Sequence, residues 1–293
     1  MTTPVVSVAL ITYNHEQYIE QAVQSVLEQQ TPFPIEILVG EDCSTDGTRA
    51  VLERLDQQHP GRLTLLPRPK NLGLSGNLQD CRERARGRYL AVLEGDDYWI
   101  DPLKLKKQHD AMEMHPDWSM CFGACRVFYE DGSREAIIKP NVFPSAPLGV
   151  DDFLQECQIQ TMSVTMYRQG IIERTPMWHS KLRIGDWALA ILHANVGPIG
   201  FVPEVLTAYR AHAGGLWSGL ATFRQWEELL ALFGYLESHF DGELATKMKL
   251  ARENVIQQCS DRVNYLERVE RRYLTLKLDR VAAACRWLLG RGR

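Results

Sequence analysis

The sequence predicts an α/β protein built on a doubly wound, mostly parallel sheet, with a helical extension at its C-terminal end. Over the first 100 residues, short apolar runs of strand length alternate with amphipathic segments, and several of these runs end in polar clusters. The hydrophobic fraction of 45% and the charged fraction of 24% are those of an ordinary globular protein. The sequence contains no run of about 18 uncharged apolar residues that could span a membrane.

The first part of the chain predicts repeated strand–helix units. Strands are expected at 5–13, 35–39, 63–66 and 89–93, with helices between them after Asn14 and at 48–55 and 75–86. Asn14 is the expected N-cap of the first helix, because Gln17 follows it at the spacing of a capping box. Strands that alternate with helices in this way pair in parallel, and ligands bind beyond their carboxyl ends.

The second part of the chain is less regular. Strands are expected at 118–129, 135–139, 160–167 and 201–209, and helices at 101–115 and 187–195. Asp131-Gly132 predicts a hairpin turn, and Asp101-Pro102 is a typical start of a helix. From Trp217 onward the chain is predicted to be helical, with Gly234 and Asp241-Gly242 as breakers.

Composition also bears on location and partners. Seven cysteines without paired spacing suit a reducing cytoplasm, and the N-terminus has no basic segment before its apolar run, so no secretory signal is expected. The net charge of −4 divides into +6 on residues 268–293 and −10 on the rest. An acidic body argues against nucleic-acid binding, which requires positive charge.

The acidic segment Glu94-Gly95-Asp96-Asp97 is the strongest chemical signal, because it follows a predicted buried strand. Clustered carboxylates are ligands that suit Mg²⁺ or Mn²⁺ bridging phosphate oxygens. Gly95 would let the backbone approach a ligand closely. The alternative is a solvated turn that caps the following helix.

A second polar cluster, Glu41 to Thr48, follows the second predicted strand. Asp42 at the strand end could accept the N3–H of a pyrimidine or bind a ribose hydroxyl, and a purely structural role is equally expected from its position alone. Asp46 and Thr48 are expected to cap the next helix.

Four segments in order carry a family resemblance: ALITYNHEQYI, ILVGEDCSTDGT, NLGLSGN and YLAVLEGDDYW. Over about the first 110 residues the sequence resembles the inverting glycosyltransferases of family 2, which have the GT-A fold. The resemblance implies a nucleotide-diphospho-sugar donor and inversion at the anomeric carbon. It implies a catalytic domain at 1–215, with a nucleotide-binding half at 1–100 and an acceptor half at 101–215, and a helical region at 216–293.

The resemblance also implies roles for donor-binding residues. Thr12, Tyr13 and Glu16 would flank the nucleobase, and Asp42 would contact it. Asn71, with Gly73, Gly76 and Asn77, lies where the family approaches the donor, and Lys70 or Arg68 could meet phosphate. Glu94, Gly95 and Asp96 correspond to the Asp-x-Asp metal motif, with Asp96 as the direct ligand of Mn²⁺ or Mg²⁺ and Glu94 in place of the commoner Asp.

Later segments resemble the family more weakly. Ile184-Gly185-Asp186-Trp187 corresponds to the segment that supplies the general base, so Asp186 would take the acceptor proton; the alternative makes Asp186 the N-cap of helix 187–195. The segment 209–218 resembles a closing lid, in which Arg210 or His212 would neutralise the diphosphate and His212 would complete the metal shell.

Other candidates have structural explanations. Cys121 and Cys125 are expected to be core residues, whereas Trp178, His179 and Arg183 could line an acceptor site. Beyond residue 268, apolar residues recur at helical spacing among arginines: Leu274, Leu278, Val281, Cys285, Leu288 and Leu289. Such a helix suits peripheral attachment to the inner face of the cell membrane, and the alternatives are packing on the body or a homodimer.

The combined prediction is a metal-dependent inverting glycosyltransferase that uses a UDP- or dTDP-sugar and a glycan or lipid-linked acceptor in bacterial cell-envelope polysaccharide synthesis. Two alternatives stay open: a sugar-nucleotide pyrophosphorylase-like GT-A enzyme, and a non-catalytic nucleotide-sugar-binding protein. The first is disfavoured because no glycine precedes Gly40 to form a phosphate loop. A dinucleotide dehydrogenase is excluded because no Gly-x-Gly-x-x-Gly follows the first strand.

Overall fold

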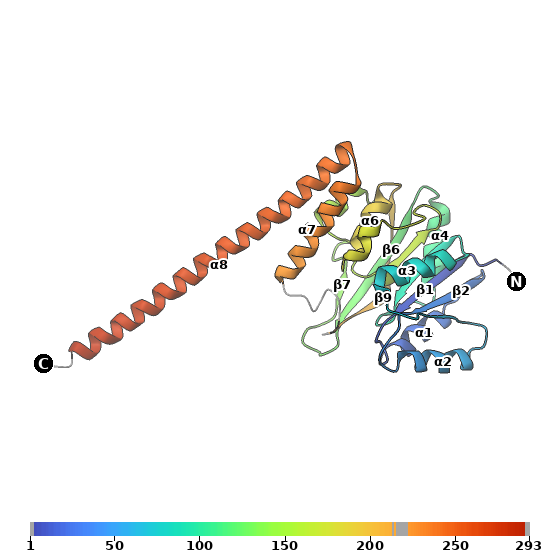
Figure 1. Cartoon of the computed structure of the whole chain (residues 1–293), viewed down its shortest axis with the longest axis horizontal. Coiled ribbons are helices and arrows are strands. Elements are labelled where there is room, and N and C mark those ends of the chain that lie inside the picture. The colour runs from blue at the N-terminus through green and yellow to red at the C-terminus, as the bar shows by residue number, and fades with distance from the viewer. Residues whose placement is uncertain (1–2, 213, 215–221, 291–293) are drawn as a thin grey trace. The chain divides into compact units, whose positions relative to one another are not determined.

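The computed structural model describes residues 3–212, 214 and 222–290, and in its last helix it describes side chains through 269 and at 272. The chain divides into two compact units, Met1–Ala221 and Thr222–Arg293, whereas the sequence placed the boundary at 215/216. The first unit contains the sheet and the second consists of helices (Figure 1). The predicted α/β class with a helical C-terminal region is confirmed.

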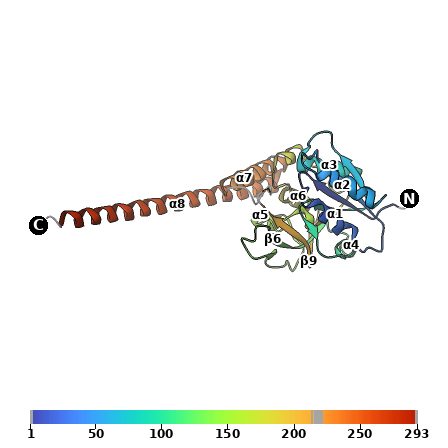
Figure 2. The same cartoon turned by 90° about the horizontal axis from the view of Figure 1, so that it is seen from below.

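The described residues of the first unit form one nine-stranded sheet. Its order is β3 (Thr64–Pro67), β2 (Ile35–Glu41), β1 (Val6–Thr12), β4 (Tyr89–Glu94), β8 (Thr165–Arg168), β6 (Met120–Tyr129), β9 (Ile199–Ala211) and β5 (Tyr98–Trp99), with β7 (Ile137–Lys139) paired to β6. The first four strands are parallel, and β8 is antiparallel to both β4 and β6. Beyond it, β6 and β9 run side by side in parallel (Figure 2). The sheet is therefore parallel in its N-terminal half and mixed as a whole.

Helices cover both faces of the parallel half. They are α1 (Ile19–Leu27), α2 (Thr48–Gln58) and α3 (Gly73–Arg84). Helices α4 (Lys104–Met114) and α6 (Gly185–Ala194) contact strands of the mixed half, and α5 (Val150–Gln155) contacts α6. Figure 1 shows α3 on one side of β1 and β2, with α1 and α2 on the other. Because both faces are covered, every residue of β1 is buried, as its apolar sequence predicts.

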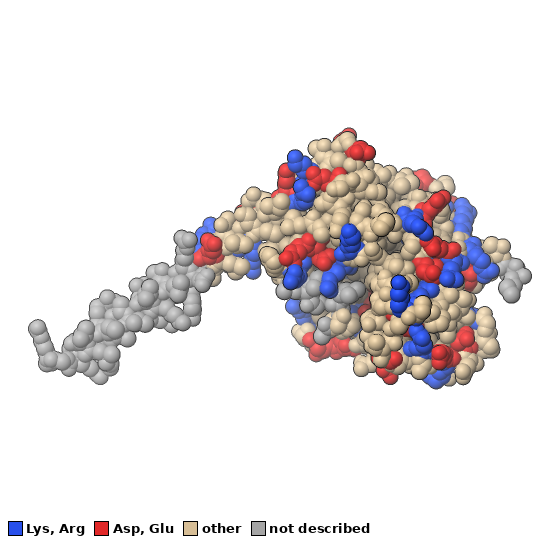
Figure 3. Space-filling model, in the orientation of Figure 1, with Lys and Arg blue, Asp and Glu red and all other residues tan. Residues whose placement is uncertain are grey.

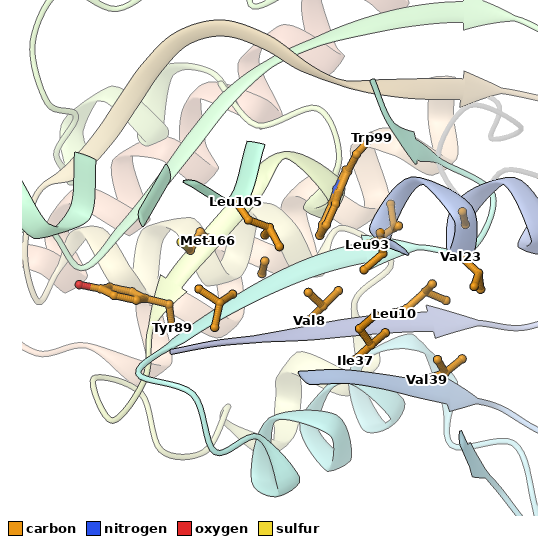
Figure 4. Packing of buried hydrophobic residues seen from close by; sticks show 14 of the residues in the cluster. Val8, Leu10, Val23, Ile37, Val39, Tyr89, Leu93, Trp99, Leu105 and Met166 are labelled. Atoms are coloured by element: carbon orange, nitrogen blue, oxygen red, sulfur yellow. The ribbon is translucent and has the colours of Figure 1, made fainter. Parts of the chain in front are cut away.

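The main core lies between the sheet and α1, α2 and α4. Val8 and Leu10 of β1 pack there with Val39 of β2, Leu93 of β4 and Trp99 of β5 (Figure 4). Burying a side chain of this size contributes roughly 1.5–3 kcal/mol. This core fixes the strand ends, and therefore the loops that follow them.

Several predicted boundaries were wrong for local reasons. Asn14 does not cap α1, which begins at Ile19; Asn14 has φ +57°, and its side-chain oxygen accepts a hydrogen bond from Thr45 N at 2.8 Å. The helix expected at 101–115 begins only at Lys104. The strand expected at 160–167 begins with a 3₁₀ turn, η1 (Met162–Val164), before β8.

Three short elements were not predicted: β5, α5 and a second 3₁₀ helix, η2 (Met177–Lys181). They have two, six and five residues, which is too short for a periodic hydrophobic pattern to be read. Cys121 and Cys125 are buried in β6, which confirms their predicted place in the core.

The second unit consists of α7 (Thr222–His239) packed against α8 (Gly242–Gly290). Gly234 lies inside α7 and does not break it, whereas Gly242 has φ +60° and begins α8. Residues 217–221, expected to be helical, are outside the described residues, as are the side chains of the apolar stripe at 274–289. Across the helices that the structure describes, none has a stretch long and apolar enough to span a membrane.

Candidate active site

A cavity of about 920 Å³ opens at the carboxyl ends of β1, β2 and β4, beside the start of α6 and the end of β9. It brings together nearly all of the predicted site residues. Those that line it are Thr12, Tyr13, Glu16, Asp42, Asn71, Glu94, Asp96, Asp186, Arg210 and His212. The structure thus gathers residues from both halves of the sheet around one space, as expected for ligands at strand ends.

Asp42 is held at one end of this cavity by backbone contacts. Its Oδ1 accepts a hydrogen bond from Leu72 N at 2.7 Å, and Asn71 Nδ2 donates to its carbonyl oxygen at 3.2 Å. Burial raises the pKa of Asp42, and the amides of Leu72 and Gly73 oppose that rise. The strand end therefore presents a carboxyl group in a fixed orientation.

Two loops close the same end of the cavity by binding each other. Gly47 N donates to Glu16 Oε2 at 2.9 Å, and Glu16 N donates to Asp46 Oδ2 at 3.1 Å. Asp46 also accepts from Thr48 N at 3.0 Å at the start of α2, where Gly47 occupies the N-cap position. Tyr13 exposes 41% of its surface, so its ring is accessible to a ligand.

The loop after β4 carries three carboxyl groups with different environments. Thr161 Oγ1 lies 2.6 Å from Glu94 Oε2 and 2.7 Å from Asp97 Oδ2. A hydroxyl has one proton, so one of these two contacts requires a protonated carboxyl. Burial, reinforced by neighbouring carboxylates, raises the pKa of Glu94 well above its usual value and that of Asp97 to about 7.

Asp96 differs from its neighbours because imidazoles surround it. Its Oδ2 lies 3.1 Å from His212 Nε2 and 3.5 Å from His15 Nε2. Burial opposes ionisation of Asp96, but the hydrogen bond from His212 and the charge of His15 outweigh it, so the pKa of Asp96 is lowered. The same hydrogen bond raises the pKa of His212, whereas burial lowers that of His15. Asp96 is therefore the ionised carboxylate of this loop.

Arg210 of β9 fixes the backbone of the loop after β4, residues 94–97, which we call the acidic loop. Its Nε donates to the carbonyl oxygen of Asp96 at 3.0 Å, and its amide donates to Asp97 Oδ1 at 3.0 Å. The guanidinium carbon also lies 4.6 Å from the centre of the Tyr18 ring and 4.9 Å from that of Phe128. Arg210 therefore lines the cavity and also holds the backbone of Asp96 and the carboxylate of Asp97.

Asp186 lines the cavity from the first turn of α6. It is not the N-cap, a position that Ile184 occupies. Its Oδ1 accepts from Trp187 N at 2.9 Å, and burial raises the pKa of Asp186 to about 6. A carboxylate with this pKa accepts protons efficiently near neutral pH.

Gly95 has a different role from the one predicted, because it does not line the cavity. A Cβ at this position would lie 2.6 Å from Thr12 Oγ1 and 2.9 Å from His15 Nδ1. Gly95 therefore makes room for these two side chains rather than for a ligand.

The weaker candidates separate into two groups. Arg68 is buried and paired with Asp80 at 2.5 Å, so it supports α3 and does not reach the cavity. Lys70 and Trp178 also lie outside the cavity lining, and His179 is buried behind it. Gly73, Asn77 and Arg183 do line the cavity, whereas Gly76 does not. In the expected lid, Tyr209 and Gly214 line the cavity, and residues 213 and 215–218 are outside the described residues.

Sequence reasoning missed His15, Tyr18 and Thr161. His15 and Tyr18 belong to the segment TYNHEQY after the first strand, so their place beside Thr12 was the available signal. Thr161 gave no such signal, because it follows Glu94 by 67 residues and Asp97 by 64 residues in the sequence. Its contacts with them depend on how the later part of the chain returns to the sheet.

Comparison with known sequences decides the family. The sequence profile described as Glycosyl transferase family 2 matches residues 7–175, which include the acidic loop. The chain belongs to glycosyltransferase family 2. Membership favours the transferase over the pyrophosphorylase-like alternative.

Several curated proteins are similar to this chain over most of its length. An uncharacterized protein of Mycobacterium tuberculosis is 38% identical over 223 residues, which are 75% of this chain and 63% of that relative's length. TuaG of Bacillus subtilis, provisionally named a teichuronic acid biosynthesis glycosyltransferase, is 34% identical over 71% of this chain and 79% of its own length. WfaP of Escherichia coli, named a UDP-Glc:α-D-GlcNAc-diphosphoundecaprenol β-1,3-glucosyltransferase, is 28% identical over 72% of this chain and 79% of its own.

Solved structures of glycosyltransferases confirm the GT-A fold. Staphylococcus aureus TarS in complex with UDP-GlcNAc aligns over 86% of this chain and 71% of its own, with a TM-score of 0.64 and 18% identity. The mannosyltransferase PcManGT of Pyrobaculum calidifontis, in complex with GDP-Man and Mn²⁺, aligns over 86% and 69%, with a TM-score of 0.61 and 18% identity.

Proposed function

We propose that this chain transfers a sugar, with inversion, from a UDP- or dTDP-sugar to a hydroxyl of a glycan or lipid-linked acceptor in cell-envelope polysaccharide synthesis. The observation that carries the proposal is the pairing of two carboxylates on one cavity: an ionised Asp96 among imidazoles and an Asp186 whose pKa is about 6. The names of TuaG and WfaP, one referring to teichuronic acid and the other to a diphosphoundecaprenol acceptor, support the choice of pathway and acceptor.

The donor's base would lie against Asp42, between Thr12, Tyr13 and Glu16. Uracil and thymine present the same N3–H and O4 atoms, so Asp42 would accept either base. The UDP-GlcNAc bound to TarS and the UDP-Glc in the name of WfaP support a uridine donor.

Asp96 and His212 fit a divalent cation as two adjacent ligands. The 3.1 Å between their donor atoms matches the separation of about 3 Å between neighbouring ligands in an octahedral site with bonds near 2.1 Å. No group of three or more His, Cys, Asp or Glu side chains in the described part of the chain could hold a metal ion, so the other ligands would be diphosphate oxygens and water. A bound Mn²⁺ or Mg²⁺ would supply positive charge for the departing diphosphate. The Mn²⁺ in the PcManGT complex supports this assignment.

Asp186 would remove the proton from the acceptor hydroxyl as that oxygen attacks the anomeric carbon. Its carboxylate lines the cavity from α6, whereas the acidic loop follows β4, so base and leaving group would belong to different walls of one space. Arg210 would hold the Asp96 backbone in place throughout, through the hydrogen bond from its Nε.

Calorimetric titration of UDP, with and without Mn²⁺, tests the donor site. Asp96→Asn should remove the Mn²⁺-dependent part of the UDP affinity, because it replaces the ionised ligand with a neutral amide. Asp110→Asn is the matched control, since Asp110 forms a surface pair with Lys106 and does not line the cavity. Equal Mn²⁺ dependence in the wild type and Asp96→Asn would refute the metal assignment.

The non-catalytic alternative requires a second measurement. Release of UDP from UDP-glucose and UDP-N-acetylglucosamine should be detectable with the wild type, because water can replace the acceptor slowly. Binding of UDP with Mn²⁺ but no turnover of any nucleotide sugar, even with lipid-linked acceptors, would favour a binding protein.

A further inference from the structure

We propose that His179 is the positioning residue that holds Asp186 in its orientation for proton transfer. This inference rests on the proposed function, because it assigns a support to the base named there. His179 is buried in η2, outside the cavity lining, and touches the first residue of α6.

The contact between His179 and α6 is specific. His179 Nε2 lies 3.0 Å from the carbonyl oxygen of Gly185, the residue immediately before Asp186. Since a carbonyl oxygen only accepts, His179 must carry its proton on Nε2. Burial lowers the pKa of His179, which favours the neutral ring with this single donor. The imidazole therefore has one tautomer and one hydrogen bond at the start of α6.

Packing of the His179 ring also restricts the backbone of the first turn of α6, in addition to the hydrogen bond. A Cβ at Gly185 would lie 3.0 Å from His179 Cε1 and 3.1 Å from Nε2, so the ring rests directly against the Gly185 backbone. The Asp186 carboxylate accepts a hydrogen bond from the Trp187 amide, which belongs to the same turn of α6. The direction of its carboxylate therefore depends on the backbone that His179 holds.

His179 is in turn attached to the donor side of the molecule. The Ser75 hydroxyl of α3 donates to the His179 carbonyl oxygen at 3.4 Å, and Leu182 N donates to the same oxygen at 3.1 Å. Helix α3 begins beside Leu72, whose amide binds Asp42. Arg82, also on α3, is the charged group that acts on the ring. One buried imidazole thus connects the helix that holds Asp42 with the turn that carries Asp186.

Two substitutions in the full chain separate positioning from packing. His179→Phe keeps the ring volume but loses the N–H, whereas His179→Gln keeps an N–H donor near the position of Nε2. The matched control is His193→Phe, which removes another buried imidazole from α6 well away from its first turn. UDP release from UDP-glucose with Mn²⁺ gives kcat, KM and the pH profile of each variant.

We expect His179→Phe to lower kcat by roughly 10- to 100-fold, the cost of a misplacement of about 1 Å, with KM for UDP-glucose within about twofold. The acidic limb of the kcat–pH profile of His179→Phe should shift from that of the wild type. His179→Gln should restore most of the wild-type kcat and most of the wild-type pH profile. An unchanged kcat and pH profile in His179→Phe would overturn the inference. So would equal losses in His179→Phe and His179→Gln, or the same pattern in His193→Phe.

Amide hydrogen exchange keeps this test separate from that of the proposed function. If the wild type releases no UDP, the proposed function fails, but exchange at residues 185–188 still reports how firmly the turn is held. Faster exchange in His179→Phe than in His179→Gln supports the inference, and equal exchange overturns it.

Discussion

At the scale of single residues, two aspartates on one cavity differ because their surroundings differ. His212 and His15 favour the charged form of Asp96, whereas burial of Asp186, opposed only by backbone amides, favours its neutral form. This is the pattern expected when one carboxylate binds a cation and the other exchanges a proton.

Replacing Asp186 should separate turnover from binding. Asp186→Asn should lower kcat by at least about 100-fold while leaving the UDP affinity nearly unchanged, because only proton transfer is lost. In the wild type, kcat should rise with pH through about 6 as the carboxyl ionises. Steady-state kinetics with Asp110→Asn as control check this, and near-normal turnover of Asp186→Asn would exclude it as the base.

The same substitution should stabilise the protein at neutral pH. The folded-state pKa of Asp186, about 6, lies above its usual value of 3.8, so the folded state binds the proton more tightly than the unfolded state. The contribution of the Asp186 carboxyl group to the free energy of unfolding is therefore fully present below pH 4 and is lost as the pH rises through 6. Asp186→Asn should gain up to about 3 kcal/mol at pH 7.5 and little at pH 4. Urea unfolding at both pH values measures this, and an equal effect at both would contradict it.

At the scale of secondary structure, the carboxyl end of β9 completes the acidic loop. Arg210→Lys should lower the free energy of unfolding by about 1–2 kcal/mol and weaken Mn²⁺-dependent UDP binding. The reason is that a lysine cannot supply both the Nε hydrogen bond and the stacking on Tyr18 and Phe128. Arg126→Lys on the neighbouring β6 is the control, since Arg126 is exposed. Thermal unfolding and calorimetry give both quantities; equal behaviour of the two variants would show that Arg210 does not support the loop.

The elements that could be predicted from the sequence are those with a long apolar pattern. β1, β2 and β4 are mostly apolar, and the rule that ligands bind at their carboxyl ends predicted that Asp42 and Asp96 lie at one edge of the sheet, where both line one cavity. The contacts of Asp96 with His212 and of Glu94 with Thr161 could not be predicted, because they join residues 116 and 67 positions apart through the order of strands in the mixed half. His179 was misplaced for the same reason: its burial depends on packing between η2, α3 and α6.

At the scale of the whole molecule, positive and negative charges are unevenly distributed along the sequence. Figure 3 shows acidic and basic side chains interspersed on the face that it draws. The excess positive charge is carried by residues 268–293, whose net charge is +6. Such a segment attracts an anionic membrane by about 1 kcal/mol per basic residue near the surface.

Removal of residues 268–293 tests the predicted membrane contact. The truncated protein should sediment less with liposomes rich in anionic lipid than the full chain does, and the difference should shrink at high salt. Liposomes of neutral lipid are the control. Equal sedimentation of both proteins would leave helix packing or a homodimer as the role of this segment.

The pairing of Asp97 with Arg210 spans 113 residues, and that of Asp96 with His212 spans 116. During synthesis the acidic loop therefore leaves the ribosome long before the cationic residues that offset it. A nascent chain that has already folded β1, β2 and β4 carries the carboxylates without the groups that fix and charge-balance them. The candidate site is thus complete only when β9 joins the sheet, so a chain that ends before β9 lacks the groups that hold its acidic loop in place.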